Sequence, residues 1–336
     1  MRSLVHKIPA GQPALQSTND GACVFCGNAS TPQFSTRDQA GEDCSFRRCT
    51  ACRTQFIFPP PDSERLTRAY ATTYYGDGES KFGPTLEKAR GFFANSRARQ
   101  MTRGLQTHSR VLDVGCGDGR LLRTISKQGD FDLYGVELPG KAAERAAKVP
   151  KINLHLGSLE TARFPDEHFD LITLVHVIEH LPKPHETIQE LARIIRPGGS
   201  LFLSFPNIES WQSSIFKGLW FHLDPPRHLS LIPPAAITNS LQGAQFQRVF
   251  SKHLNLEQNI YGWVQSMLNL SPARRNLLYE RIKNNSDYTS STSNATIAAH
   301  VAAAALILPT AILADIVAAI FSRGATVEML FRKNNR

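Results

Sequence analysis

The sequence of 336 residues lacks several features that would assign it to a specialised class. It shows no internal repeat, and its first residues, MRSLVHKIPAGQP, contain no apolar run. Because a secretory signal peptide needs such a run, we expect the protein in the cytoplasm. The sequence also has no arginine-rich run and no aromatic RNA-binding motif, so nucleic acid is a less favoured partner than a small molecule.

Acidic residues are the scarcer charged class. The chain has 29 Asp and Glu against 38 Lys and Arg, which gives a formal net charge of +9 at pH 7. This balance favours acidic partners such as anionic lipid headgroups, phosphorylated substrates or nucleic acid, although a soluble basic enzyme has the same balance. The chain is long enough to bury a full core and to carry an accessory domain.

The stretch that organises the chain is VLDVGCGDGRLL, residues 111–122. Its apolar start predicts a buried strand, and the glycines Gly115, Gly117 and Gly119 predict a turn, after which helical spacing resumes. A strand, a glycine turn and a helix open a nucleotide-binding α/β sheet. Glycine allows a ligand to approach the backbone closely, and the helix N-terminus offers it free N–H groups.

The spacing of these glycines differs from the dinucleotide fingerprint G-x-G-x-x-G. Gly119 comes one residue early, Arg120 occupies the sixth position, and an acid, Asp113, lies inside the strand. Further strands alternate with predicted helices along the chain. They are predicted at residues 133–137, 152–156, 169–175, 200–207, 246–253 and 325–333.

This order of motifs resembles the class I S-adenosylmethionine (SAM) dependent methyltransferases, in particular the type 11/23 families. The resemblance covers roughly residues 85–255 and the last strand. It implies an α/β fold, a doubly wound, Rossmann-like sheet of seven strands with the last strand antiparallel, and SAM as the cofactor. Ser158 stands where many relatives have Asp, and Cys116 is expected mainly to pack. The residues that the resemblance assigns to SAM are Asp113, Gly115, Cys116, Gly117, Gly119, Glu137, Leu138, Ser158, Leu159 and Val175.

Four of the six cysteines form two C-x-x-C pairs, Cys23 with Cys26 and Cys49 with Cys52. Two such pairs about twenty residues apart have zinc-ribbon spacing, and four thiolates complete a closed tetrahedral site for structural Zn²⁺. Disulfides are the alternative, which a cytoplasmic location disfavours. Cys44 lies between the pairs and could replace one ligand.

The strongest catalytic candidates are His176, Glu179 and His180, which follow the strand at 169–175, together with His228. The segment resembles that of ubiquinone-pathway O-methyltransferases and small-RNA 2′-O-methyltransferases, in which E-x-x-E-H and a later His bind a divalent metal. This chain has His176 where the first Glu would be. Three interpretations stay open: a second divalent metal at His176, Glu179 and His180, joined by His222 or His228; a metal-free base at His176 or His228; or a structural role for Glu179 and His180.

Three residues are candidates for contact with the acceptor substrate. The resemblance implies that Tyr74 and Tyr75, before the fold, cover the pocket, and simple packing is the alternative. Arg227, in the sequence DPPRHL, is expected to bind an acidic acceptor such as a phosphate or a carboxylate. Similar sequences occur in bacterial methyltransferases linked to glycan and cell-surface biosynthesis.

A long apolar run, residues 297–321, precedes the last strand. It has nearly the length of a transmembrane helix, but the last strand must return to the same sheet, which excludes a single crossing. Pro309 divides the run, so we expect a helical hairpin. Its basic flanks favour docking on an anionic membrane surface, and burial in a homodimer or the core is the alternative.

These predictions divide the chain into five parts. They are a flexible tail (1–20), a zinc ribbon (21–60), a helical pocket cover (61–105), the methyltransferase domain (106–256 and 324–336) and a helical insertion (257–323). The predicted function is SAM-dependent O-methylation of a glycan, a lipid-linked sugar or a prenyl-phenol, in the cytoplasm or at the inner face of the membrane. The alternatives are RNA 2′-O-methylation with a metal-assisted His/Glu site, and a non-catalytic SAM-binding scaffold whose ribbon binds a partner.

Overall fold

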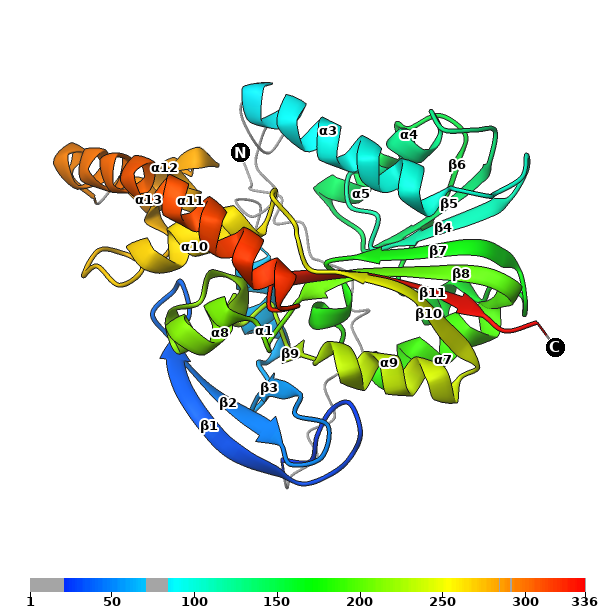
Figure 1. Ribbon diagram of the computed structural model, residues 1–336, viewed down its shortest axis with the longest axis horizontal. Helices are drawn as coiled ribbons and strands as arrows, with labels where there is room; N and C mark the ends of the chain where they lie inside the picture. The colour runs from blue at the N-terminus through cyan, green and yellow to red at the C-terminus, as the bar shows by residue number, and fades with distance from the viewer. Residues whose placement is uncertain (1–20, 71–83, 284, 291, 336) are drawn as a thin grey trace, which may run out of the picture.

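The computed structural model describes residues 21–70, 84–283, 285–290 and 292–335. Figure 1 shows a twisted central sheet with helices on both faces, a small sheet at one end and a group of helices beside it. The predicted tail at 1–20 and the predicted pocket residues Tyr74 and Tyr75 lie outside the described residues.

The central sheet has seven strands in the order β10-β11-β8-β7-β4-β5-β6. The strands from β4 to β8 pair in parallel, whereas β11 lies antiparallel between β8 and β10. This arrangement confirms the predicted doubly wound sheet with an antiparallel last strand. The bounds of the strands are β4 Arg110–Val114, β5 Asp132–Glu137, β6 Ile152–Leu156, β7 Phe169–Val175, β8 Ile195–Pro206, β10 Phe246–Lys252 and β11 Thr326–Lys333.

Both faces of the central sheet are covered by helices (Figure 1). One side carries α3 (Pro84–Met101), α4 (Arg120–Ile125) and α5 (Lys141–Ala146), and the other carries α7 (Pro184–Ile194) and α9 (Pro234–Gly243). Alternate residues of a strand therefore enter two buried clusters, as Leu112 and Val111 of β4 do. Burial on both faces explains why the parallel strands read as continuous apolar runs.

The cysteine-rich region forms a second sheet of four strands, β1 (Ser30–Arg37), β2 (Asp43–Cys49), β3 (Gln55–Ile57) and β9 (Ser230–Leu231). The last strand comes from the part of the chain that follows β8, and it pairs with β3. Side chains of the ribbon, including Phe25 and Phe56, belong to the same buried cluster as Leu112 of the central sheet. The ribbon and the central domain therefore share a core.

The insertion before β11 contains α10 (Asn259–Leu268), α11 (Leu277–Ile282), α12 (Ser286–Thr289) and α13 (Asn294–Ile320). The predicted hairpin is wrong, because α13 continues through Pro309 as one helix. A proline inside a helix costs about 3 kcal/mol, since it removes an N–H donor and crowds the preceding turn. The surrounding Ala and Leu residues are the strongest helix formers, and Ser293 caps the N-terminus by accepting from Thr296 N–H.

Among the described residues, α13 is the one helix that is long and apolar enough to cross a membrane, judged by length and composition. It packs along α10 and leads directly into β11 (Figure 1).

Candidate functional site

The glycine loop after β4 has the geometry of a ligand cradle. Gly115, Gly117 and Gly119 have φ of 67°, 57° and 72°, a region that glycine enters without strain. A Cβ on Gly115 would lie 2.5 Å from Val177, and one on Gly119 would lie 2.9 Å from Val149, so packing requires both glycines. A Cβ on Gly117 would meet no described atom within 4 Å. Gly117 therefore borders open space, where a ligand can approach the backbone.

Glu137, at the end of β5, lies across this loop. Its carboxylate accepts hydrogen bonds from Gly117 N–H at 2.7 Å and from Leu138 N–H at 2.9 Å. Burial raises the pKa of Glu137, and the two N–H donors partly oppose that shift. An acid at the end of the second strand of such a unit is placed to accept hydrogen bonds from ribose hydroxyls.

Asp113 is buried beneath the loop, where Thr173 Oγ1 of β7 donates a hydrogen bond to it at 2.6 Å. Burial raises the pKa of Asp113 to about 7 against the opposing effect of this hydrogen bond, and the charge of Glu137 raises it further. The buried carboxyl group of Asp113 and the partly buried one of Glu137 have no cation among their described contacts, so they suit a ligand that carries positive charge. SAM is such a ligand, through its sulfonium and its ammonium group.

The other residues assigned to the cofactor have identifiable local roles. The Cys116 side chain is buried and packs beneath the loop, as expected. Burial raises the pKa of its thiol, which keeps the thiol protonated. Ser158 caps the short helix α6 (Leu159–Ala162) by accepting from Thr161 N–H, and Leu159 is buried. Val175 ends β7. Their contact with SAM stays a prediction.

A second polar group begins directly after β7 with His176. This residue has φ of 56°, a conformation that is uncommon outside glycine and that recurs at functional sites. Its Nδ1 lies 3.3 Å from Glu179 Oε1, and its Nε2 is buried with no hydrogen-bond partner in the described part of the chain. The neighbouring Val177 contacts the glycine loop, so His176 lies beside the predicted cofactor site.

Glu179 is almost completely buried in a 3₁₀ turn, Ile178–His180. Burial alone would raise the pKa of its carboxyl group, but the hydrogen bond to His176 and the neighbouring His180 bring the pKa down to about 2. Its Oε2 has no hydrogen-bond partner among the described residues. Glu179 is therefore a buried carboxylate with one oxygen free to bind.

Backbone carbonyls orient two further histidines. His180 Nδ1 lies 3.0 Å from the carbonyl of Arg227, and His228 Nδ1 lies 2.8 Å from the carbonyl of His222. A carbonyl only accepts, so each Nδ1 carries a proton and donates it to the carbonyl. Burial lowers the pKa of His180 to about 4 and that of His222 to about 3, so both are neutral at pH 7.

The structure groups the candidate metal ligands differently from the prediction. Ligand atoms of Glu179, His180 and His228 lie within 4.8 Å of one another, whereas His176 contacts Glu179 without belonging to that group. The predicted set of His176, Glu179 and His180 shares Glu179 and His180 with this group, and its binding of a metal stays a prediction. One carboxylate and two imidazoles suit Zn²⁺ or Mn²⁺ better than Mg²⁺.

Sequence reasoning missed Tyr70. Its hydroxyl lies 2.8 Å from His180 Nδ1, and it follows the last residue of helix α1 (Ser63–Ala69). The signal available in the sequence was the aromatic segment at 69–75, from which only Tyr74 and Tyr75 were selected. The contact joins residues 110 positions apart, so local pattern could not identify it.

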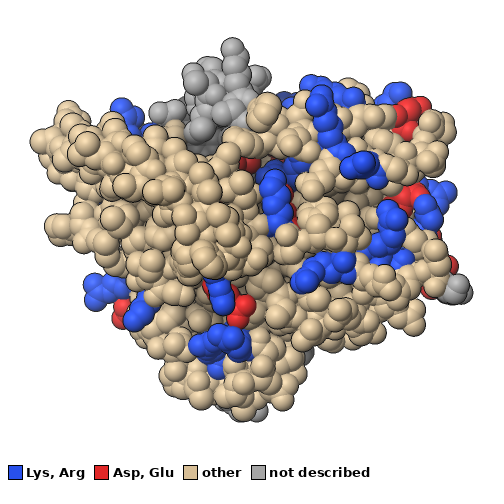
Figure 2. Space-filling model, in the orientation of Figure 1, with Lys and Arg blue, Asp and Glu red and all other residues tan. Residues whose placement is uncertain are grey.

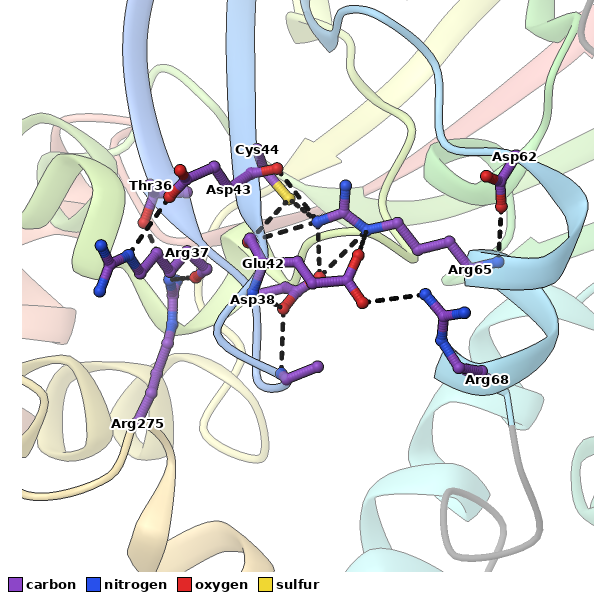
Figure 3. Close-up of polar contacts among 11 residues, drawn as sticks. Thr36, Arg37, Asp38, Glu42, Asp43, Cys44, Asp62, Arg65, Arg68 and Arg275 are labelled. Atoms are coloured by element: carbon purple, nitrogen blue, oxygen red, sulfur yellow. Dashed lines mark hydrogen bonds and ion pairs between the residues drawn. The ribbon is translucent and has the colours of Figure 1, made fainter.

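Helix α1 is held in place by ion pairs with the ribbon (Figure 3). Arg65 binds Asp38 at 2.6 Å and lies 2.9 Å from the Cys44 thiol, while Arg68 binds Glu42 at 2.9 Å. Cys44 therefore contacts α1 and does not belong to the four-cysteine group. The network connects the ribbon to the helix that carries Tyr70 toward His180.

Arg227 is buried, and its described contacts are with protein groups. Its guanidinium pairs with Asp224 and donates to the carbonyl of Ala69 at 3.1 Å. Burial would raise the pKa of Asp224, but Arg227 and His228 hold it at about 2. These contacts attach the loop at 224–228 to α1. Binding of an acidic acceptor by Arg227 stays a prediction, and an acceptor would compete with them.

The four cysteines of the ribbon come together as predicted. Cys23, Cys26, Cys49 and Cys52 have sulfur atoms within 4.8 Å of one another, with three of the separations at 3.3 to 3.6 Å. Four sulfurs at ~2.3 Å from a central Zn²⁺ lie about 3.8 Å apart, so the geometry fits. In each pair a backbone N–H points at the first sulfur, and Gly27 and Arg53 after the pairs have positive φ.

Comparisons with known proteins agree with this geometry. The sequence model of a family described as Methyltransferase domain matches residues 86–250. A ubiquinone biosynthesis O-methyltransferase of Aromatoleum aromaticum is 35% identical over 106 residues, which are 29% of this chain and 44% of the relative. The enzyme of the same name from Coxiella burnetii is 34% identical over 102 residues, 29% of this chain and 43% of the relative. The alignments thus span less than half the length of these relatives.

Solved structures share the fold at low identity. The [4+2]-cyclase SpnF superposes with a TM-score of 0.51 at 15% identity, covering 81% of this chain and 93% of that one. Phospholethanolamine N-methyltransferase 2 of Haemonchus contortus has a TM-score of 0.52 at 14% identity, covering 84% and 62%. A cyclase and a methyltransferase carry this fold, so the fold alone does not decide the reaction. Residues 86–250 thus match a methyltransferase domain, and together with the glycine loop and the order of the strands this match supports a class I SAM-dependent methyltransferase.

Proposed function

We propose that this protein transfers the methyl group of SAM to a hydroxyl oxygen of a small-molecule acceptor. The observation that carries the proposal is the pair of His176 and Glu179 beside the glycine loop. Nδ1 of His176 contacts the buried carboxylate, and its Nε2 is unpaired among the described residues. An imidazole held by a carboxylate on one nitrogen and free on the other is suited to accept a proton.

The reaction requires one proton acceptor and accurate positioning. SAM supplies a methyl group activated by a positively charged sulfur. His176 Nε2 accepts the hydroxyl proton as the acceptor oxygen bonds to the methyl carbon and the carbon–sulfur bond breaks, which leaves S-adenosylhomocysteine. Glu179 stabilises the imidazolium that forms. Most of the rate enhancement comes from holding the two reactants in line.

The acceptor class that we propose is a prenylated phenol. Support comes from the relatives named ubiquinone biosynthesis O-methyltransferases, and from the neutral histidines His180 and His222, which offer no fixed charge to an ionic acceptor. A lipid-linked sugar and a free glycan are the other outcomes that the experiment below distinguishes.

A divalent metal at Glu179, His180 and His228 is a second candidate for activating the hydroxyl. The ligand atoms lie within 4.8 Å of one another, Oε2 of Glu179 is unpaired in the described structure, and backbone carbonyls orient both imidazoles through Nδ1. A metal there would polarise the acceptor oxygen. Metal analysis separates the two candidates. A metal at Glu179, His180 and His228 requires two ions per chain, one of which is lost in Glu179→Gln. A metal-free base at His176 requires only the one ion held by the ribbon cysteines.

We also propose that the ribbon cysteines hold structural Zn²⁺. The four thiols leave no position for a substrate, and the cluster shares its core with the central sheet. A zinc content of one per chain that is unaffected by Gly117→Arg is the expected result. A chain that is fully folded and free of zinc would contradict it.

The test of the proposed reaction uses purified full-length protein, methyl-labelled SAM and a cell extract split into organic-soluble, polar, glycan and RNA fractions. Label in the organic-soluble fraction is expected. His176→Gln should lower the transfer rate by about 10² to 10⁴-fold with little change in SAM affinity. Label confined to the glycan or RNA fraction would overturn the acceptor class. SAM binding without label in any fraction would indicate a non-catalytic scaffold.

A further inference from the structure

Helix α13 exposes a continuous apolar face to solvent. Leu306, Leu313 and Ile320 are seven residues apart, so they lie on one face of the helix, with 80%, 63% and 73% of their surfaces exposed. Other large exposed apolar side chains border this outer face. They are Val301, Leu308, Ile312, Ile316 and Phe321. A contiguous group of large exposed apolar side chains is typical of a binding surface.

The opposite stripe of α13 is fastened to the protein. Its buried residues, His300, Ala311, Asp315 and Ala318, face the core of the insertion, and α13 packs along α10. The contact includes His300 Nε2 at 3.2 Å from Ser271 Oγ. The helix is therefore held on one side along its length, and its apolar outer face is available without any rearrangement.

The sheet topology excludes α13 as a membrane span. Its 27 residues make a helix ~40 Å long, which exceeds the ~30 Å hydrocarbon core of a bilayer. However, Thr326 begins β11 shortly after the helix ends, and β11 pairs with β8 and β10, which precede α13 in the chain. Both ends of the helix therefore lie on the same side of any membrane. A helix with this constraint can only lie in the membrane surface.

The charges around the outer face favour an anionic partner. Among the described side chains of residues 257–323, the exposed charged residues after α10 are Arg274, Arg281 and Arg323. The acids Glu280 and Asp315 are buried. The surface over α13 in Figure 2 is uncharged, and charged residues of both signs appear only toward its margins. An uncharged face in an insertion whose exposed charged residues are arginines matches a hydrocarbon layer that lies beneath anionic headgroups.

The composition of the outer face argues against a second copy of the chain as the occupant. Protein interfaces are enriched in Tyr, Trp and Arg and use hydrogen bonds at the rim, whereas this face is almost entirely aliphatic. A symmetric contact would also bring together the same arginines of two chains that each carry a net charge of +9. We propose that the outer face of α13 docks this protein on the surface of an anionic lipid bilayer, independently of which acceptor is methylated.

The experiment measures flotation of the full-length protein with vesicles of phosphatidylcholine alone or of phosphatidylcholine with phosphatidylglycerol. The test variant Leu306→Asp/Leu313→Asp places two acids on the outer face. The matched control Phe92→Asp/Val249→Asp places two acids at apolar positions of α3 and β10 that are 72% and 56% exposed. SAM affinity and circular dichroism confirm that each variant is folded, and sedimentation reports the oligomeric state.

The wild type and the control should bind the anionic vesicles, and the test variant should bind at least tenfold less. Binding to neutral vesicles should be weaker and less sensitive to salt. Equal flotation of the wild type and the test variant would overturn the proposal, as would a wild-type chain that does not float. A wild-type dimer that Leu306→Asp/Leu313→Asp converts to a monomer, without vesicle binding, would assign the face to a second copy instead.

Discussion

Two polar regions lie at the carboxyl ends of different parallel strands of the central sheet, and they are built in different ways. The cofactor region consists of the glycine loop after β4 and Glu137 at the end of β5, which are consecutive units of the chain. The histidine region joins Tyr70 from α1, the turn after β7 and the loop that contains His228. The comparison shows that a site made from adjacent units can be predicted from the sequence, whereas a site made from distant segments can be predicted only in part.

The electrostatics of the two regions also differ. In the cofactor region burial raises the pKa of Asp113 and of Glu137, because no cation compensates them among their described contacts. In the histidine region the carboxylates of Glu179 and Asp224 have lowered pKa values, despite their burial, because histidines and Arg227 surround them. The first region is therefore prepared for a cationic ligand, and the second is already compensated within the protein.

The largest expected effect is the loss of SAM binding when the cofactor region is blocked by a substitution. Gly117→Arg places a long side chain in the open space beside the loop and should leave no measurable SAM binding, as calorimetry would show. Gly41→Arg is the matched control, because Gly41 also has positive φ and open space but lies in the ribbon. Retention of normal SAM affinity in Gly117→Arg would show that the cofactor lies elsewhere.

The next effect acts on the histidine region alone. Glu179→Gln removes the carboxylate that holds His176 and should lower the methyl-transfer rate by about 100-fold, because the imidazolium loses its partner. SAM affinity should change less than about twofold, since Glu179 does not contact the loop in the described structure. Glu186→Gln, an exposed acid of α7, is the control. A loss of SAM affinity as large as the loss of rate would remove the distinction between the regions.

A smaller effect tests the contribution of the distant segment. Tyr70→Phe removes the hydroxyl that contacts His180 Nδ1 and should lower the transfer rate by roughly tenfold, the size expected for one hydrogen bond. Tyr288→Phe is matched, because it removes a hydroxyl that donates to the carbonyl of Arg275 in the insertion. If the two variants behave alike in kcat and in SAM affinity, Tyr70 serves packing only.

The smallest effect is a pH dependence within the cofactor region. Because the pKa of Asp113 is raised to about 7, its carboxyl group is protonated at pH 6 and ionised at pH 8. A cationic ligand binds the ionised form better, so SAM affinity should rise roughly fivefold between these pH values, a shift of under one pKa unit on binding. Asp113→Asn should show a flatter profile. Parallel profiles for wild type and variant would exclude Asp113 as the titrating group.

The cysteine-rich region and helix α13 show where prediction from the sequence fails. The cysteine spacing in residues 21–60 predicted that the four cysteines come together, but the pairing of β3 with β9 and the shared core were not predictable, because these contacts join remote segments. Pro309 was expected to divide the apolar run into two helices, yet α13 continues through it. The prediction considered the cost of a proline inside a helix but not the strong helix propensity of the neighbouring Ala and Leu residues.

By itself, the sequence determined the seven-stranded sheet, the glycine loop with Asp113 and Glu137, and the cysteine cluster. These depend on strand periodicity, on backbone angles that glycine adopts freely and on spacings within a single turn, all of which are local. Only the tertiary structure decided that His228 joins Glu179 and His180, that Tyr70 reaches His180, and that the apolar face of α13 stays exposed. These features depend on which distant segments pack together, because a contact across the fold leaves no periodic trace in the chain.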